Sequence, residues 1–433
     1  MLTSHDDMVS VTFDVIPRRA KLGRMSGVWR RLALRLAFCC EIMQSLIGKS
    51  SAELRTWLID RELLPALEAQ IKRPLLPLPD NFTAPTRMPW GGTKIIGKYK
   101  QGRPLRPAKQ YPLVGESWEI SADPIAPSEF TFDLGAETIL IELIQLLDLF
   151  PDEILGARVA AKFAGQNPIL AKIIDAADDL SVQVHPSDDY AGLRPHESGK
   201  PECWYILEAE PGGGLYLGLR EGVSQETLRR ALENQEDGAQ YLNFVEVHPG
   251  EFFVIDAGMI HAIGAGVTLI EPQKIAPKKS GKTYRLWDWN RKYDAQGRKD
   301  PQGQPRELHI QECLEVIDFA GPRGAAFLNY VRPQPQVVQQ QGASVETRLV
   351  ETANFGVSQL VLKNGGTLTG NCAASFHGII VYAGTLTICQ PHGLKIAEIP
   401  CGQAVILPAN LQAYTLQGAQ AQGIKVYYPE QYL

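Results

Sequence analysis

Two short segments of the sequence carry potential metal ligands at spacings that place them on one side of a strand. In SVQVHPSDDY (residues 181–190), two valines alternate with Gln183 and His185. Successive side chains of a β-strand point to opposite faces, so one face is expected to be apolar and the other to carry the amide and the imidazole. In SGKPECWYIL, Lys200 and Glu202 are also two residues apart and are expected to share a face.

His261 adds a second imidazole, and the residues around it follow a known spacing. Residues 250–261 read G-x5-D-x-G-x2-H, and residues 402–413 read G-x5-P-x-N-x2-A. Both resemble the second motif of the cupin superfamily, in which a strand, a turn and a further strand present a ligand histidine. The first copy keeps the histidine and the second has Ala413 in its place. We therefore expect two cupin-like barrels, of which only the first holds a metal in the usual way.

Gln183, His185, Glu202 and His261 form a mixed nitrogen and oxygen ligand set. Such a set suits Zn²⁺ and also Fe²⁺, Mn²⁺ or Co²⁺. It contains no thiolate, which argues against a thiol-rich structural zinc site. A set that can also accept water or a substrate oxygen is better suited to Lewis-acid chemistry. A single histidine is more often structural than a ligand, and it is the shared faces and the cupin spacing that favour a metal site here.

The chain after about residue 90 consists of short apolar runs separated by Gly, Pro and Asp turns. Examples are SWEISA, CWYIL, LYLGL, EFFVI and YRLWDW, and this pattern is typical of a β-sandwich or barrel. QETLRRALEN (225–234) is expected to be a helix between strands. We expect a mainly β protein with two cupin-like jelly-roll barrels and few helices. The metal-binding catalytic domain is placed at residues 86–322, and the second barrel, without the metal histidine, at residues 323–433.

Residues 1–85 differ from the rest and are expected to form an N-terminal helical extension and a linker. Residues 18–35 contain seven basic residues and no acidic one, which is most simply a solvated basic face, with a membrane-surface or partner role as the alternative. The following segment is expected to be helical, because Ser50 and Glu53 fit a capping box. The proline-rich residues 73–89 are expected to be a linker.

Composition and charge exclude several classes of function. The formal net charge of −5 gives no overall attraction for nucleic acid or anionic membranes. The seven cysteines are scattered without a CxxC pair, which favours a reducing, cytoplasmic compartment. No signal peptide is expected, and the apolar segment 32–48 is interrupted by Arg35 and Glu41, so no transmembrane segment is expected either. There is no P-loop or GxGxxG motif to support nucleotide binding.

In four motifs the sequence resembles the type I mannose-6-phosphate isomerase family, also called phosphomannose isomerase, in its short bacterial form. These motifs are QVHP, GKPE, GMIHAIGAG and TYRLWDWNR, and the resemblance covers about residues 86–433. WGGTKI and GESWEISADP also resemble the family's N-terminal strands. The resemblance implies one metal per chain, usually Zn²⁺, held by the same four residues: Gln183, His185, Glu202 and His261.

The resemblance also implies a reaction, the interconversion of D-mannose 6-phosphate and D-fructose 6-phosphate through an enediol or enediolate. A divalent metal stabilises the negative charge that develops on oxygen, and a carboxylate or amine moves the carbon-bound proton. Arg285 matches the family's catalytic arginine, Glu271 an acidic active-site residue and Lys200 the lysine of GK-x-E. We expect Glu271 to be the base, with Lys200 as the alternative if burial depresses its pKa.

A sugar phosphate substrate needs cations, and the nearest candidates in the sequence are lysines. Lys94 and Lys282 are expected to bind substrate. Lys278 and Lys279 lie beside Lys282 in a segment that is longer than the family's usual link. Two other functions remain open: a non-catalytic bicupin that binds a sugar as a sensor or scaffold, and another cupin enzyme such as an iron-dependent dioxygenase.

Overall fold

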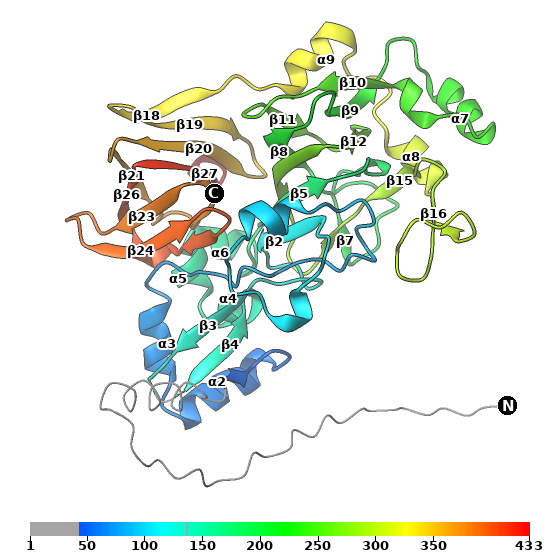
Figure 1. Cartoon of the computed structure of the whole chain (residues 1–433). Helices are drawn as coiled ribbons and strands as arrows, with labels where there is room; N and C mark the ends of the chain where they lie inside the picture. The colour runs from blue at the N-terminus through cyan, green and yellow to red at the C-terminus, as the bar shows by residue number, and fades with distance from the viewer. Residues whose placement is uncertain (1–42, 136) are drawn as a thin grey trace, which may run out of the picture. The chain divides into compact units, whose positions relative to one another are not determined.

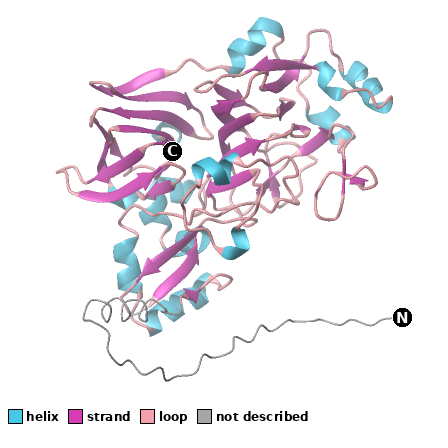
Figure 2. Cartoon of the chain, viewed as in Figure 1, coloured by secondary structure: helices cyan, strands magenta, loops and turns pink. Residues whose placement is uncertain are grey.

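The computed structural model describes residues 43–135 and 137–433, and Gln44–Leu433 form one compact unit. Strands dominate this unit, with short helices between them (Figure 1, Figure 2). The fold is therefore mainly β, as the sequence predicts. The basic segment 18–35 lies outside the described residues. None of the helices in the described ranges is long and apolar enough to cross a membrane.

The first β-rich block contains two five-stranded antiparallel sheets. One sheet has the order β11-β8-β13-β5-β2 and the other the order β10-β9-β12-β6-β15. The strands of the first sheet are β2 (Glu116–Ile120), β5 (Ile169–Ala176), β8 (Glu202–Ala209), β11 (Phe252–Ile255) and β13 (Val267–Lys274). Those of the second sheet are β6 (Val182–Val184), β9 (Gly214–Leu219), β10 (Leu242–Glu246), β12 (His261–Ile263) and β15 (Tyr284–Trp287). Short two-residue strands pair at the margins of the block: β7 (Glu197–Ser198) with β14 (Ser280–Gly281), and β16 (Lys292–Tyr293) with β17 (Gln304–Pro305).

Strand β5 shows how the sequence pattern directs side chains in this block. ILAKIIDA is buried along its whole length, as expected for a strand that is covered on both faces. Ile169 and Ile173 belong to the hydrophobic cluster that includes residues of the second block, such as Ile424. Side chains alternate along a strand, so Lys172 projects to the opposite face. That face lines a cavity described below.

The second β-rich block repeats the two-sheet arrangement. Its sheets have the orders β18-β19-β20-β27-β22-β25 and β21-β26-β23-β24. Their strands are β18 (Gln336–Gln341), β19 (Ser344–Glu351), β20 (Gly356–Lys363), β21 (Thr367–Asn371), β22 (His377–Ala383), β23 (Thr385–Cys389), β24 (Lys395–Pro400), β25 (Ala404–Leu407), β26 (Ala413–Gln417) and β27 (Gln420–Tyr427). Ala413 begins β26 just as His261 begins β12. The two copies of the cupin-like spacing thus lie at corresponding turns.

The helices lie between and beside the sheets. They are α2 (Ser51–Asp60), α3 (Leu64–Gln70), α4 (Leu143–Leu149), α5 (Pro151–Leu155), α6 (Ala157–Lys162), α7 (Gln225–Glu233), α8 (Ile310–Val316) and α9 (Gly324–Val331). The structure confirms the helix predicted over 225–234. It also confirms the capping box, in which Ser50 and Glu53 bond each other's backbone N–H groups.

Residues 44–85 pack as part of the compact unit. Strand β1 (Gln44–Ser45) pairs with β4 (Thr138–Glu142), which in turn pairs with β3 (Glu129–Asp133). The proline-rich residues 73–89, predicted to be a linker, instead bond to the sheets, for example through Leu75 and the carbonyl of Ile406. Proline lacks an N–H group, but its neighbours can still pair at a sheet edge. The domain boundaries at residues 85 and 322 stay predictions.

Candidate active site

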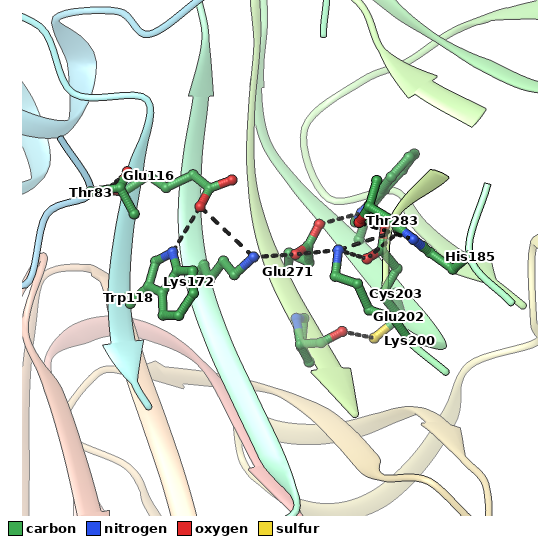
Figure 3. Close-up of polar contacts among 12 residues, drawn as sticks. Thr83, Glu116, Trp118, Lys172, His185, Lys200, Glu202, Cys203, Glu271 and Thr283 are labelled. Atoms are coloured by element: carbon green, nitrogen blue, oxygen red, sulfur yellow. Dashed lines mark hydrogen bonds and ion pairs between the residues drawn. The ribbon is translucent and has the colours of Figure 1, made fainter. Parts of the chain in front are cut away.

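The two sheets of the first block bring three of the predicted metal ligands together. His261 lies directly opposite Gln183 in the ladder between β12 and β6, and His185 follows the end of β6. Glu202 begins β8 in the facing sheet. One ligand atom from each of His185, Glu202 and His261 lies within 4.8 Å of the others, and all three residues are buried. Figure 3 shows His185 and Glu202 from these separate strands pointing toward one another.

Backbone carbonyls fix the orientation of both imidazoles. Nδ1 of His185 lies 3.1 Å from the carbonyl oxygen of Lys282, and Nδ1 of His261 lies 2.8 Å from that of Met259. Their Nε2 atoms consequently face the Glu202 carboxylate, at 3.4 and 3.5 Å. Metal-binding histidines are usually oriented in this way, with the outer nitrogen donating to a carbonyl.

One buried oxygen at this point has no partner. Glu202 Oε1 makes no hydrogen bond with any described residue, although it is fully enclosed. An unpaired buried carboxylate oxygen is costly and calls for a missing partner. A divalent cation between this oxygen and the two Nε2 atoms would satisfy all three groups, so the donor set fits a metal.

The electrostatics favour the ligating forms of these residues. Burial lowers the pKa of His185 to about 4 and also lowers the pKa of His261, so both imidazoles are neutral near pH 7. Burial alone would raise the pKa of Glu202, but Lys200 and the neighbouring His185 and His261 together outweigh it and hold that pKa well below its usual range. A neutral imidazole and an ionised carboxylate are the forms that bind a metal.

Gln183, the fourth predicted ligand, lies beside this group. Its side-chain Nε2 is 3.3 Å from Nε2 of His261. A half-turn rotation of the side-chain amide exchanges its nitrogen and oxygen, so the Gln183 oxygen can occupy the position beside His261 instead. The structure thus brings all four predicted ligand residues to one place.

The predicted catalytic residues Glu271 and Lys200 lie on the same side of the first sheet. Lys200 Nζ is 2.6 Å from Glu202 Oε2 and 3.7 Å from Glu271 Oε1. The indole N–H of Trp204 donates to the other Glu271 oxygen at 3.1 Å. Burial lowers the pKa of Lys200, but Glu202 and Glu271 raise it more, so its pKa lies above the usual range. This differs from the depressed pKa that a neutral Lys200 base requires, and it favours an ammonium that donates hydrogen bonds.

A cavity of about 380 Å³ opens next to these residues. Its walls include Gln183, Lys200, Glu271 and Arg285, together with apolar side chains such as Ile263. Arg285 lies opposite Gln183 in the ladder between β15 and β6, which explains why it reaches this space. The predicted catalytic residues therefore share this cavity with Gln183, whereas His185, Glu202 and His261 lie behind its wall and are not among its lining residues.

Arg285 has no carboxylate partner among the described residues. Its Nε donates to the Ser181 hydroxyl at 3.2 Å and its Nη1 to the carbonyl of Glu307 at 2.9 Å. Asp288 bonds Arg306 instead, through both carboxylate oxygens. Burial, followed by the charge of Arg306, lowers the pKa of Arg285. Two guanidinium groups near one another at a cavity favour the binding of an anion.

The structure does not bring the two predicted substrate lysines into the cavity. Lys94 Nζ pairs with Glu210 at 3.0 Å, and Lys282 Nζ pairs with Glu197 at 2.7 Å. Lys282 supports the site differently, through the carbonyl that faces His185. The lysines near Lys282 in the sequence, Lys278 and Lys279, line a separate cavity of about 220 Å³ and do not line the active-site cavity.

Sequence reasoning missed several residues of the cavity wall: Arg87, Glu116, Trp118, Lys172 and Arg306. A signal existed for Lys172, since a single lysine within the apolar run ILAKIIDA must have a partner when the strand is buried. Glu116 and Trp118 share a face of ESWEI in the same way. Neither arginine had such a signal, because both lie outside the regular strands.

Comparisons with known proteins give the family. Residues 84–204 match the model of the family "Phosphomannose isomerase type I, catalytic domain". The chain is 29% identical over 331 residues to mannose-6-phosphate isomerase of Streptococcus mutans, covering 76% of this chain and 92% of that protein. It is 32% identical over 254 residues to mannose-6-phosphate isomerase ManA of Bacillus subtilis, covering 58% of this chain and 72% of that protein.

Solved structures share the fold. The mannose 6-phosphate isomerase structure from Bacillus subtilis aligns with a TM-score of 0.62 and 23% identity, over 82% of this chain and 99% of that one. A putative mannosephosphate isomerase from Archaeoglobus fulgidus aligns with a TM-score of 0.60 and 23% identity, over 82% and 98%. On the sequence matches and the shared fold, this chain belongs to the type I phosphomannose isomerase family, whose members are also called mannose-6-phosphate isomerases.

Proposed function

We propose that this chain is a metal-dependent aldose-ketose isomerase that interconverts D-mannose 6-phosphate and D-fructose 6-phosphate. The observation that carries the proposal is the buried group of His185, Glu202 and His261, in which one carboxylate oxygen is unpaired. The group contacts Gln183 and Lys200, which line a polar cavity. Family membership supports the isomerase activity, and the named relatives supply the substrate. The retention of Glu271 and Arg285 in the same cavity favours catalysis over sugar binding by a sensor.

Gln183, His185, Glu202 and His261 would hold the metal, and Zn²⁺ suits this mixture of nitrogen and oxygen donors. When bound, a divalent metal supplies Lewis-acid stabilisation of negative charge on the substrate oxygens. The protein residues prepare this environment: burial keeps the imidazoles neutral, and Lys200 helps to keep the carboxylate ionised.

Glu271 moves the proton between C1 and C2 in the proposed reaction. Its carboxylate lines the cavity and is held by Trp204 Nε1 at one oxygen and by Lys172 Nζ at the other, at 3.1 Å in each case. A positioned carboxylate of this kind can accept a carbon-bound proton and return it to the neighbouring carbon. The ammonium groups of Lys172 and Lys200 stabilise the negative charge that develops on the enediolate oxygens.

Arg285 and Arg306 form the cationic side of the proposed substrate site. Both line the cavity, and Arg285 has no carboxylate partner in the described part of the chain. We propose that Arg285 contacts the reacting sugar oxygens and that Arg306 binds the phosphate group, since guanidinium groups pair well with phosphate.

Arg306→Gln is expected to raise the KM for mannose 6-phosphate about tenfold, with little change in kcat, because a charged hydrogen bond to the substrate is lost in ground and transition state alike. Steady-state kinetics measure both constants. Arg298→Gln is a matched control, since Arg298 pairs with Asp294 and does not line the cavity. An unchanged KM in Arg306→Gln would remove Arg306 from the substrate site.

All residues of the proposed site lie between residues 86 and 322. This supports the proposed catalytic domain over these residues and a second domain without the metal histidine. The five described cysteines are free, which supports our proposal of a reducing, cytoplasmic location.

A coupled assay tests the proposed function directly. The purified chain, loaded with Zn²⁺, is expected to convert mannose 6-phosphate into fructose 6-phosphate, and to act poorly on unphosphorylated mannose. A sensor protein would bind mannose 6-phosphate in calorimetry without converting it. Binding without turnover would therefore contradict the proposal.

A further inference from the structure

The Lys172 ammonium has a second set of partners on the side away from Glu271. Its Nζ lies 3.8 Å from Glu116 Oε2 and 4.8 Å from the centre of the Trp118 ring. The indole N–H of Trp118 donates to the same Glu116 oxygen at 2.7 Å. Trp118 thus holds Glu116 through its N–H and attracts Lys172 through its ring face. Figure 3 shows Glu116, Trp118, Lys172 and Glu271 in this sequence of contacts.

Strand register explains why these residues meet. Trp118 on β2 lies directly opposite Lys172 on β5, and Lys172 lies directly opposite Glu271 on β13. The three side chains form one row across three neighbouring strands. Glu116, two residues before Trp118, shares its face. All four residues are buried and all line the active-site cavity.

The row divides the attraction of one ammonium between two carboxylates. Lys172 bonds Glu271 at 3.1 Å, while Glu116 attracts it from the opposite side. Glu116 and Glu271 are the carboxylates that contact the Lys172 ammonium among the described residues. Loss of the Glu116 charge would leave Glu271 as the one anionic partner among them. Lys172 would then pair more tightly with Glu271, and the carboxylate would be less available to the substrate.

We propose that Glu116 is a positioning residue that acts on Glu271 through Lys172. This inference rests on the proposed isomerase function. In the positioning role, Glu116 contacts neither the proposed metal ligands nor the reacting atoms. The polar contacts of its carboxylate are with Trp118 and Lys172. Trp118 completes the arrangement by fixing the Glu116 carboxylate.

Glu116→Gln is the direct test, because glutamine keeps the shape and the oxygen that accepts from Trp118 but loses the charge. The Zn²⁺-loaded variant is expected to show a kcat about tenfold lower, with KM within about twofold of wild type and an unchanged zinc content. Glu119→Gln is a matched control on the same strand, since Glu119 pairs with Lys100 and does not line the cavity. Its kcat should stay within about twofold of wild type.

A double-mutant cycle separates positioning from a merely structural role. In a Lys172→Met background, Glu116→Gln should change kcat by no more than about twofold, because its path to Glu271 is already gone. A further tenfold loss in that background, or a wild-type kcat in the single variant, would overturn the inference. If Glu116→Gln does not fold, as judged by thermal unfolding, Trp118→Phe replaces it, because phenylalanine keeps the ring face but loses the N–H that holds Glu116. The kcat of Trp118→Phe is expected to fall about threefold when Lys172 is present and to show no such decrease in the Lys172→Met background.

The same experiment distinguishes a failure of the proposed isomerase function from a failure of the positioning role of Glu116. A wild-type chain that does not isomerise mannose 6-phosphate would overturn the proposed function and this inference with it. An active wild-type chain whose kcat is insensitive to Glu116→Gln would overturn the positioning role alone.

Discussion

His261→Ala is expected to abolish stoichiometric zinc binding and to lower kcat/KM by at least about a thousandfold, because several kcal/mol of charge stabilisation are lost with the metal. The imidazole is fully buried, and its Nε2 faces Glu202 at 3.5 Å. No other described histidine or carboxylate belongs to this ligand group except His185 and Glu202. Elemental analysis of the purified variant measures zinc per chain, and a coupled assay measures activity.

His248→Ala is the control for that variant, because His248 is exposed and lies outside the ligand group. It should keep both zinc and activity. A His261→Ala chain that retained one zinc per chain and wild-type kcat/KM would remove His261 from the metal site.

Glu271→Gln is expected to lower kcat by about 10²- to 10⁴-fold while zinc binding is kept, because an amide cannot accept the carbon-bound proton. The carboxylate is buried between the Lys172 ammonium and the Trp204 indole, and glutamine retains its shape and acceptor oxygen. Incorporation of deuterium from solvent at C1 or C2 of the substrate measures the proton transfer itself. This incorporation should slow in parallel with kcat.

Glu208→Gln is the matched control, since Glu208 lies on the same sheet but pairs with Lys98 and does not line the cavity. Near-normal solvent exchange in Glu271→Gln would contradict the role of Glu271. It would place the proton transfer on one of the two cavity lysines, Lys172 or Lys200, instead.

The candidate metal ligands could be predicted because the patterns that indicate them lie within short segments of the sequence. Alternation in SVQVH places Gln183 and His185 on one face, and the cupin-like spacing around His261 identifies the third residue. The structure brings His185 and His261 together with Glu202 in one buried group, with the half-buried Gln183 beside it. Metal binding by these residues stays a prediction. The mainly β fold follows from similar local patterns, namely short apolar runs between turn residues.

Other parts of the site depend on contacts between distant segments and could not be predicted in this way. The row of Trp118, Lys172 and Glu271 exists only because three strands pair in one register. Lys94 and Lys282 looked available for a phosphate, but Glu210 and Glu197 hold their ammonium groups. Ion pairs of this kind join residues that are far apart along the chain, so no spacing in the sequence indicates them.

The central claim is that catalysis by this chain depends on a metal held by the His185, Glu202 and His261 group, and chelation tests it most directly. The chain is treated with a chelator, shown to be metal-free by elemental analysis, and assayed for conversion of mannose 6-phosphate into fructose 6-phosphate before and after addition of one equivalent of Zn²⁺. We predict that the metal-free chain is inactive and that Zn²⁺ restores the activity. Undiminished conversion by the metal-free chain would contradict the account.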